Sequence, residues 1–270
     1  MSSHLFRNLH KGPGLLLLPN AWDAVSARLI ESLGARAIAT TSAGLAWAHG
    51  YADGNSLPQA QLIAAIRDIA RVIQAPLTVD VEAGYADDPA AVVRLVARVM
   101  ELGAVGINIE DGGGSPDLLC RKISAIRDCV ASSGAELFIN ARTDVLLRGI
   151  AHGGAATEEI IHRATRYRAA GCDGLFVPGL ATADAMAAVS AAIEPTPLNV
   201  MAVPGLPSMD TLAKSGVRRL STGSALAQAA IGRASHLASG FLAGHFGAMF
   251  EASIGYEAAN GLFAGCAHDS

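Results

Sequence analysis

The chain has 270 residues, of which 51% are hydrophobic and 16% charged, and its formal net charge is −4. This length suits one large α/β barrel, and the low charged fraction allows a large buried core. The charge balance and the absence of a Lys/Arg run exclude a nucleic-acid-binding surface, and no apolar stretch is long enough to predict a membrane span. The N-terminal segment lacks the apolar core of a secretory signal, and the four cysteines form no CxxC pair. We therefore expect a cytoplasmic protein with free thiols.

Eight short apolar runs recur along the chain, each followed by small or polar residues. Near-continuous apolarity over such short lengths is typical of parallel strands that are buried on both faces. The runs are residues 15–19, 37–42, 77–82, 105–110, 137–142, 174–179, 198–203 and 218–223.

The segments between these runs have helical signals. In 88–103, apolar residues recur at helical spacing, and Asp88 followed by Pro89 predicts a capped helix start. Several predicted helices end at a glycine that precedes the next strand: Gly34, Gly103, Gly171 and Gly216. Eight strand–helix units predict a single (β/α)8 TIM-type barrel over residues 1–240, followed by a C-terminal helical tail over 241–270.

Acidic side chains end two consecutive strands. Asp80 and Glu82 are two residues apart, so both point to the same side of their strand, and Glu110 and Asp111 follow the next strand. In such a barrel the carboxyl ends of the strands meet at one face, where these carboxylates would repel one another. A hard divalent cation, Mg2+ or Mn2+, would relieve that repulsion. We predict a metal site at Asp80, Glu82 and Glu110; the alternative is that these acids are solvated or pair with arginine.

Two further strand ends complete the predicted site. Arg142 offers a planar fork of donors for a carboxylate or phosphate, unless it pairs with one of the acids. The run Thr41-Ser42-Ala43-Gly44-Leu45 has small residues that let backbone N–H groups approach an anion. No lysine ends a strand, which excludes Schiff-base aldolase chemistry. A metal and an arginine together predict an anionic, oxygen-rich substrate.

The chain resembles the isocitrate lyase/phosphoenolpyruvate mutase superfamily, and within it the phosphonomutase-like branch. The resemblance covers about residues 15–235 and is most specific in DVEAGY followed by NIED. It rests on PNAWDA (19–24), TTSAGLAWAHGYADG (40–54), VDVEAGYADD (79–88), GINIEDG (106–112), INARTD (139–144) and LFVPGL (175–180).

This resemblance implies roles for individual residues. Asp80 would contact Mg2+ directly, while Glu82 and Glu110 would act through metal-bound waters. Arg142 would stabilise enolate charge, Asp53 would belong to a mobile loop, and Tyr85 or Tyr51 would supply or organise a proton. The residues expected to bind the substrate are Ser42, Ala43, Gly44, Leu45, Asp80, Asn108 and Arg142.

The chain also departs from its relatives in two places. Isocitrate and methylisocitrate lyases carry a K-[KR]-C-G-H loop after the fourth strand, where this chain reads DGGGSPDLLCRKISA, so Cys120 does not take the place of their catalytic cysteine. The strand-six histidine typical of the mutases is replaced by Val177-Pro178. The predicted metal site, Arg142 and the loop at 42–45 remain, and together they are sufficient to decarboxylate a β-keto acid.

These features predict a Mg2+-dependent carbon–carbon lyase that acts on a small 2-oxo or 2-hydroxy dicarboxylate through a metal-stabilised pyruvate enolate. Oxaloacetate decarboxylation is the simplest case. The alternatives are cleavage of a substituted malate, a C–P bond mutase or hydrolase, and a barrel that binds 2-oxo acids without useful turnover.

The resemblance further implies a homo-oligomer, a dimer or tetramer, in which C-terminal helices are exchanged between subunits. An apolar stripe in the tail is suited to this role, although it could equally pack against its own barrel. The stripe consists of Phe241, Leu242, Phe246, Met249 and Phe250.

Overall fold

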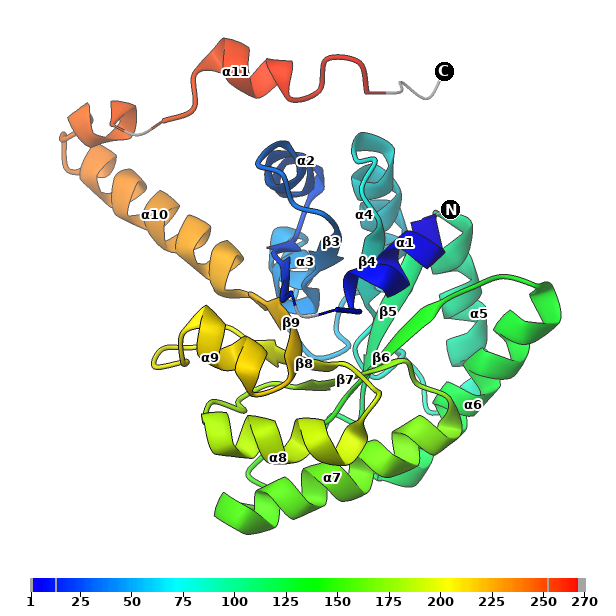
Figure 1. Ribbon diagram of the computed structural model, residues 1–270. Coiled ribbons are helices and arrows are strands. Elements are labelled where there is room, and N and C mark those ends of the chain that lie inside the picture. Colours follow the sequence, from blue (N-terminus) through cyan, green and yellow to red (C-terminus); the bar gives the residue numbers. More distant parts are fainter. Residues whose placement is uncertain (1, 13, 252, 267–270) are drawn as a thin grey trace.

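Nine parallel strands form a nearly closed barrel in the computed structural model, which describes residues 2–12, 14–251 and 253–266 (Figure 1). The order of the strands around the barrel is β1-β9-β8-β7-β6-β5-β4-β3-β2. The strands are β1 (Leu16–Leu18), β2 (Asn20–Ala21), β3 (Ile38–Thr40), β4 (Leu77–Asp80), β5 (Ala104–Glu110), β6 (Phe138–Arg142), β7 (Gly174–Val177), β8 (Leu198–Met201) and β9 (Val217–Ser221). Each of the eight predicted runs overlaps one of these strands, and two strands, β5 and β9, begin one residue before the predicted run, so the predicted TIM-like fold is confirmed.

The ninth strand arises because the first barrel strand is divided in two. β1 pairs with β9, with Leu18 opposite Ser221, whereas β2 pairs with β3, with Ala21 opposite Thr40. Pro19 alone separates them, and proline has no N–H group to donate to a strand ladder. The two ends of the sheet therefore meet on one short segment.

Helices surround the barrel and connect its strands (Figure 1). They are α1 (Ser2–Leu9), α2 (Ala24–Ser32), α3 (Ser42–Ala48), α4 (Gln59–Val72), α5 (Pro89–Glu101), α6 (Pro116–Ser133), α7 (Gly153–Ala170), α8 (Ala183–Ile193), α9 (Met209–Lys214), α10 (Ala225–Leu242), the 3-10 helix η1 (Gly247–Phe250) and α11 (Tyr256–Gly261). The predicted cap of α5 is present, because the Asp88 carboxylate accepts from the N–H groups of Ala90 and Ala91. The four predicted helix-ending glycines all have positive φ, between 81° and 106°.

The strands separate an outer core from a barrel interior. Along β5, Ile107 and Ile109 belong to the outer core beneath the helices, whereas Asn108 points into the barrel. The amino end of the interior is filled by a smaller apolar cluster that includes Phe6 and Leu9 of α1 together with Phe138. α1 therefore closes this end of the barrel, and the opposite, carboxyl end is left for a site.

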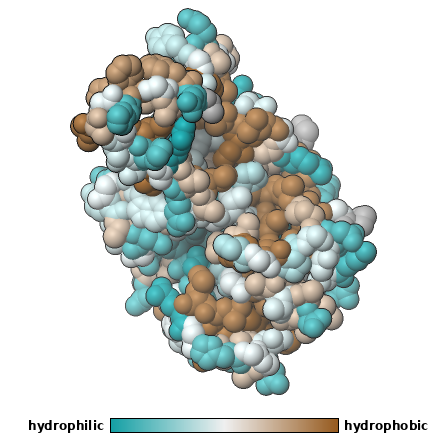
Figure 2. Space-filling model, turned by 90° about the vertical axis from the view of Figure 1, so that its left-hand side faces the viewer, coloured by the Kyte–Doolittle hydropathy of each residue, from teal (hydrophilic) through white to brown (hydrophobic). Residues whose placement is uncertain are grey.

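The C-terminal segment leaves the barrel and then returns to it (Figure 1). Ala227 is the one buried residue of α10, and apolar surface is visible on this side of the molecule (Figure 2). Phe241 and Leu242 are 56% and 85% exposed. Beyond α11, the Leu262 carbonyl accepts a 2.6 Å hydrogen bond from Arg28 Nε. Among the described helices, none combines the length and apolarity needed to cross a membrane.

The environment of His10, at the amino end of the barrel, predicts that the free energy of unfolding depends on pH. His10 is buried, stacks on Phe138 at 4.3 Å and donates from Nδ1 to the Phe6 carbonyl. Burial, with Arg219 nearby, lowers the pKa of His10 from 6.5 to about 3. The unfolded chain therefore binds a proton on this residue between pH 6.5 and 3 while the folded state does not, so stability falls as the pH decreases through this window.

We expect His10→Phe to remove a pH dependence that approaches about 1.4 kcal/mol per pH unit, measured by urea unfolding between pH 7 and 4. The matched control is His4→Phe on the same helix, because His4 is exposed and its replacement should leave the profile unchanged. Identical profiles for wild type and His10→Phe would contradict the assignment.

Candidate functional site

A pocket of about 170 Å3, here called the inner pocket, lies at the carboxyl ends of the strands. Six residues predicted from the sequence line it: Ser42, Ala43, Asp53, Asp80, Asn108 and Arg142. Its other lining residues are Asn20, Thr41, Leu147, Phe176, Pro178, Met201, Ser221, Gly223 and Ser224. The site thus gathers the ends of most strands of the barrel, as expected for this fold.

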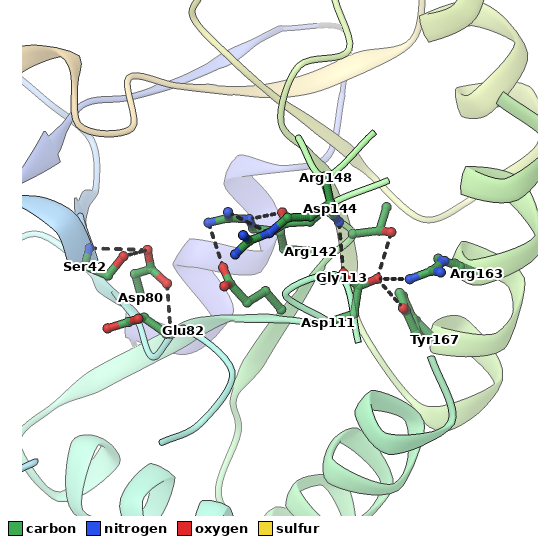
Figure 3. A network of polar contacts seen from close by, with 12 residues as sticks. Ser42, Asp80, Glu82, Asp111, Gly113, Arg142, Asp144, Arg148, Arg163 and Tyr167 are labelled. Carbon is green, nitrogen blue, oxygen red and sulfur yellow. Dashed lines mark hydrogen bonds and ion pairs between the residues drawn. The ribbon is translucent and has the colours of Figure 1, made fainter. Parts of the chain in front are cut away.

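Asp80 is held in a fixed orientation at the end of β4 (Figure 3). Its Oδ2 accepts hydrogen bonds from the backbone N–H and the hydroxyl of Ser42, at 3.3 and 3.0 Å. Its Oδ1 accepts from the Glu82 N–H at 3.1 Å. Oδ1 therefore keeps lone-pair capacity for a further contact within the pocket.

Glu82 is held by a strained turn directly after β4. Its Oε1 accepts from the Tyr85 hydroxyl at 2.7 Å, and its Oε2 accepts from the backbone N–H of Asn55. All three residues have φ between 50° and 58°, a region that non-glycine residues rarely adopt. Burial, opposed by these hydrogen bonds and reinforced by Asp80 and Asp53, raises the pKa of Glu82. Such strain persists only where the surrounding structure fixes it, which is typical of functional sites.

Arg142 lies between two carboxylates. Its Nη1 is 2.7 Å from Glu110 Oε2, and its Nε and Nη2 form a two-pronged contact with Asp144 at 2.6 and 3.1 Å (Figure 3). The guanidinium also lies 5.8 Å from the centre of the Phe176 ring. Pairing with an acid was the alternative to substrate binding, and the structure shows that pairing while Arg142 still lines the inner pocket.

Glu110 keeps an elevated pKa despite this partner. Burial is the largest cause, Arg142 acts against it, and Asp80, Asp144 and Glu82 add to it, so the pKa of Glu110 rises to about 8. Burial together with the neighbouring acids therefore outweighs the effect of Arg142 on Glu110.

The fourth carboxylate, Asp111, is not part of this cluster. It points to α7, where it accepts from Arg163 Nη1 at 2.9 Å and from the Tyr167 hydroxyl at 2.7 Å (Figure 3). It also accepts from the Thr143 hydroxyl and from the Asp144 backbone N–H. Asp111 thus anchors the segment that carries Arg142 and lies apart from the three predicted metal carboxylates.

The donor set suits a hydrated divalent cation. Within the described ranges, no three Asp, Glu, His or Cys side chains converge into a complete ligand set, and of the three predicted ligands only Asp80 lines the inner pocket. Mg2+ usually keeps several waters and takes one or two protein carboxylates directly. One anchored aspartate with two glutamates nearby fits this mode of binding. Burial and, to a smaller extent, the neighbouring acids raise the pKa values of Glu82 and Glu110, and a cation would stabilise their charged forms.

Four other predicted residues do not line the inner pocket. Tyr51 accepts a hydrogen bond from Gln61 Nε2 at 3.4 Å. Leu45 is fully buried in the outer core. Gly44 lies so close to Trp22 that an added Cβ would be 2.7 Å from the Trp22 Cβ. Tyr85 contacts Glu82.

Beneath the inner pocket lies a polar layer that the sequence analysis missed. Asn108 Oδ1 accepts from Asn140 Nδ2 at 2.9 Å and from Arg219 Nη2 at 3.2 Å, which fixes the orientation of the Asn108 amide. Arg219 is 1% exposed, and its Nε and Nη1 have no partner in the described part of the chain. Burial lowers the pKa of Arg219 to about 9, with Asp80 acting against that change.

The Asp111 network predicts a large stability effect. Replacing Asp111 with Asn removes one of the two carboxylates that contact the buried Arg163 and leaves Glu159, at 2.6 Å, as the other. We expect a loss of about 2 kcal/mol in the free energy of unfolding at pH 7, because the charge-assisted hydrogen bonds to Asp111 are weakened. Denaturant titration measures the loss. The control is Asp210→Asn, which removes an exposed ion pair with Lys214 and should change little. Equal effects of the two changes would show that the network contributes no more than a surface pair.

Comparisons with known proteins identify the family to which the chain belongs. A family profile described as phosphoenolpyruvate phosphomutase matches residues 6–242. An uncharacterized protein of Mycobacterium tuberculosis is 39% identical over 238 residues, which cover 86% of this chain and 87% of the relative. A crystal structure from Burkholderia cenocepacia assigned as a lyase/mutase is 34% identical, covers 97% of this chain and 95% of its own, and superposes with a TM-score of 0.88.

A more distant relative, the oxaloacetate decarboxylase of Pseudomonas entomophila, is 33% identical over 174 residues, 60% of this chain and 57% of the relative. The profile match spans most of the barrel and its site. The chain therefore belongs to the phosphoenolpyruvate phosphomutase family, within the phosphoenolpyruvate mutase/isocitrate lyase superfamily.

Proposed function

We propose that the protein is a Mg2+-dependent carbon–carbon lyase for a small 2-oxo or 2-hydroxy dicarboxylate, with oxaloacetate decarboxylation as its simplest reaction. The observation that carries this proposal is the joint presence of Asp80 and Arg142 on the wall of one inner pocket. An anchored carboxylate that can hold a cation then faces a guanidinium that can bind an anion. The distant relationship to an oxaloacetate decarboxylase supports the same choice.

The residues of the pocket have distinct tasks in this reaction. Asp80 would hold Mg2+ directly, and Glu82 and Glu110 would accept hydrogen bonds from water molecules on the cation. The bound cation would supply Lewis-acid polarisation of the substrate oxygens. Ser42 and Asn108 orient the substrate, and Arg142 stabilises the negative charge that builds on the 2-oxo oxygen as carbon dioxide leaves. Tyr85 holds Glu82 in place through its 2.7 Å hydrogen bond, and Asp53 borders the pocket on the loop before α4.

The first test compares pyruvate release from oxaloacetate and from substituted malates, with Mg2+ or with EDTA. We expect saturable, EDTA-sensitive release by wild type and a loss of at least about 100-fold in kcat/KM for Asp80→Ala, because the anchored cation ligand is gone. Asp210→Ala, a change at an exposed pair, should keep full activity. Full activity of Asp80→Ala would refute the site, and thermal unfolding of each variant separates lost chemistry from lost structure.

Chemistry at a C–P bond is the second candidate, supported by the family to which the chain belongs. The same variants assayed with a 3-carbon phosphonate distinguish it, because only this route releases phosphate or rearranges the phosphoryl group. A barrel that binds 2-oxo acids without turnover would show Mg2+-dependent binding and no product from any of these substrates.

We also propose that the tail over 241–270 takes part in contacts between copies of the chain. Four of its large apolar side chains, Phe241, Leu242, Phe246 and Phe250, are 56–85% exposed, which is an unfavourable state for an isolated subunit. Residues 267–270 lie outside the described part of the chain. The contact of Leu262 with Arg28 ties the end of the tail to its own barrel, so the proposed contact surface is the projecting α10 and η1.

Light scattering after size exclusion tests this surface. We expect wild type to have the mass of a dimer or tetramer, and the double change Phe241→Ser with Leu242→Ser to lower that mass, because it removes exposed apolar area. Leu5→Ser, at a side chain 51% exposed on α1, is the control and should leave the mass unchanged. A monomeric wild type would refute the proposal.

A further inference from the structure

A second polar pocket adjoins the inner pocket and is larger. This outer pocket has a volume of about 290 Å3 and lies among the loops that follow β3, β4, β5 and β6 and the first turns of α6. Polar and charged side chains on its wall include Asn55, Asp87, Glu110, Asp111, Lys122 and Arg148.

One ion pair divides the two pockets. Arg142 lines the inner pocket, Glu110 lines the outer pocket, and their side chains are 2.7 Å apart. A single loop borders both, because Asp53 faces the inner pocket while Gly54 and Asn55 face the outer pocket. The two pockets therefore share the Arg142–Glu110 pair as a wall and the loop at 53–55 as a rim, over which a ligand would have to extend to reach both.

The outer pocket contains a buried ammonium group with donors to spare. Lys122 is 3% exposed, although lysine is seldom buried without a close partner. It donates one hydrogen bond, to the Ala83 carbonyl at 2.8 Å. Its ion-pair partner Asp87 is 3.9 Å away and has a side chain that is 96% exposed. An ammonium has three N–H donors, so this group can bind an anion in the pocket.

A guanidinium faces the same space. Arg148 has a side chain that is 60% exposed, and its nearest carboxylate, Asp144, lies 4.0 Å away and is already bound by Arg142. The position of Arg148 depends on the glycines of the loop after β5. A Cβ at Gly113 would lie 2.9 Å from Arg148 Cγ, and Gly113 has a φ of 79°.

The acids that line the outer pocket contact other cations more closely than they contact Lys122 or Arg148. Glu110 is paired with Arg142, and Asp111 with Arg163. Asp87 projects into solvent, where its charge is screened. Lys122 and Arg148 lie 3.9 and 4.0 Å from their carboxylate partners, so a carboxylate bound in the pocket would match free donors of both.

We propose that the outer pocket binds a second carboxylate, at the far end of the substrate, through Lys122 and Arg148. This assignment rests on the proposed function, because it places the two ends of one substrate in adjoining pockets. It makes the preferred substrate a diacid longer than oxaloacetate, with the reacting end beside Asp80 and the distal acid beyond the Glu110–Arg142 pair.

Calorimetric binding in the presence of Mg2+ tests the proposal without relying on turnover. The probes are oxalate, which occupies the inner pocket alone, a series of 2-oxo diacids of five to seven carbons, and 2-oxo monoacids of the same lengths. We expect wild type to bind a diacid of suitable length about tenfold or more tightly than its matched monoacid. Lys122→Met and Arg148→Gln should each reduce this preference severalfold and leave oxalate affinity within about twofold.

The controls are Lys214→Met and Arg94→Gln, which make the same changes at exposed residues and should keep the preference for diacids. If the buried Lys122→Met variant does not fold, Arg148→Gln at its exposed position decides the question. Oxalate binding without any preference for diacids in wild type, or a preference that survives Arg148→Gln, would overturn the outer site alone. Absence of oxalate binding would instead count against the inner site and the proposed function.

Discussion

The arrangement of the site depends on negative charge concentrated at the ends of β4 and β5. Asp80 pairs in register with Asn108, and the Glu110 N–H donates to the Glu82 carbonyl, so the strand pairing brings these acids together. Burial is the main cause of the raised pKa values of Glu82 and Glu110, and the neighbouring carboxylates add to it. Arg142 is the guanidinium in direct contact with this cluster, and the surrounding hydrogen bonds hold Arg142, Asp80 and Glu82 in place.

The interior of the barrel changes from apolar to charged along its axis. Phe6 and Phe138 fill the amino end, the amides of Asn108 and Asn140 lie above them, and Asp80 lies at the carboxyl end. Arg219 lies within the amide layer as a fully buried cation that is only partly hydrogen-bonded, an arrangement that ordinarily destabilises a fold. Stability therefore comes mainly from the outer core of Val, Leu and Ile between strands and helices, while the interior is adapted to binding.

Local patterns made the barrel and part of the site predictable from the sequence. Apolar runs, the Asp88 cap and the helix-ending glycines are signals within a few residues, and side-chain alternation placed Asp80 correctly. Alternation also puts Asp111 on the side of β5 opposite to Glu110, which agrees with its contacts to α7. Its partners Arg163 and Tyr167 are 52 and 56 residues away and carry no local signal. In the sequence VRRLS, Arg219 has the appearance of an exposed residue, because only closure of the sheet places its side chain in the barrel interior.

The loop after β5 determines how much room lies beside the Glu110–Arg142 pair in the outer pocket. In the related lyases this stretch carries the K-[KR]-C-G-H run, whereas here Gly112, Gly113 and Gly114 lead directly into the Ser115 cap of α6. Three residues without side chains leave room beside Glu110, and Gly113 lets Arg148 approach that room. The Glu110–Arg142 pair then belongs to both pockets at once. A carboxylate in the outer pocket would repel Glu110 and favour its contact with Arg142, which changes the charge that Arg142 presents to the inner pocket. Recognition of the distal end and stabilisation of the reacting end would then be coupled through this one contact.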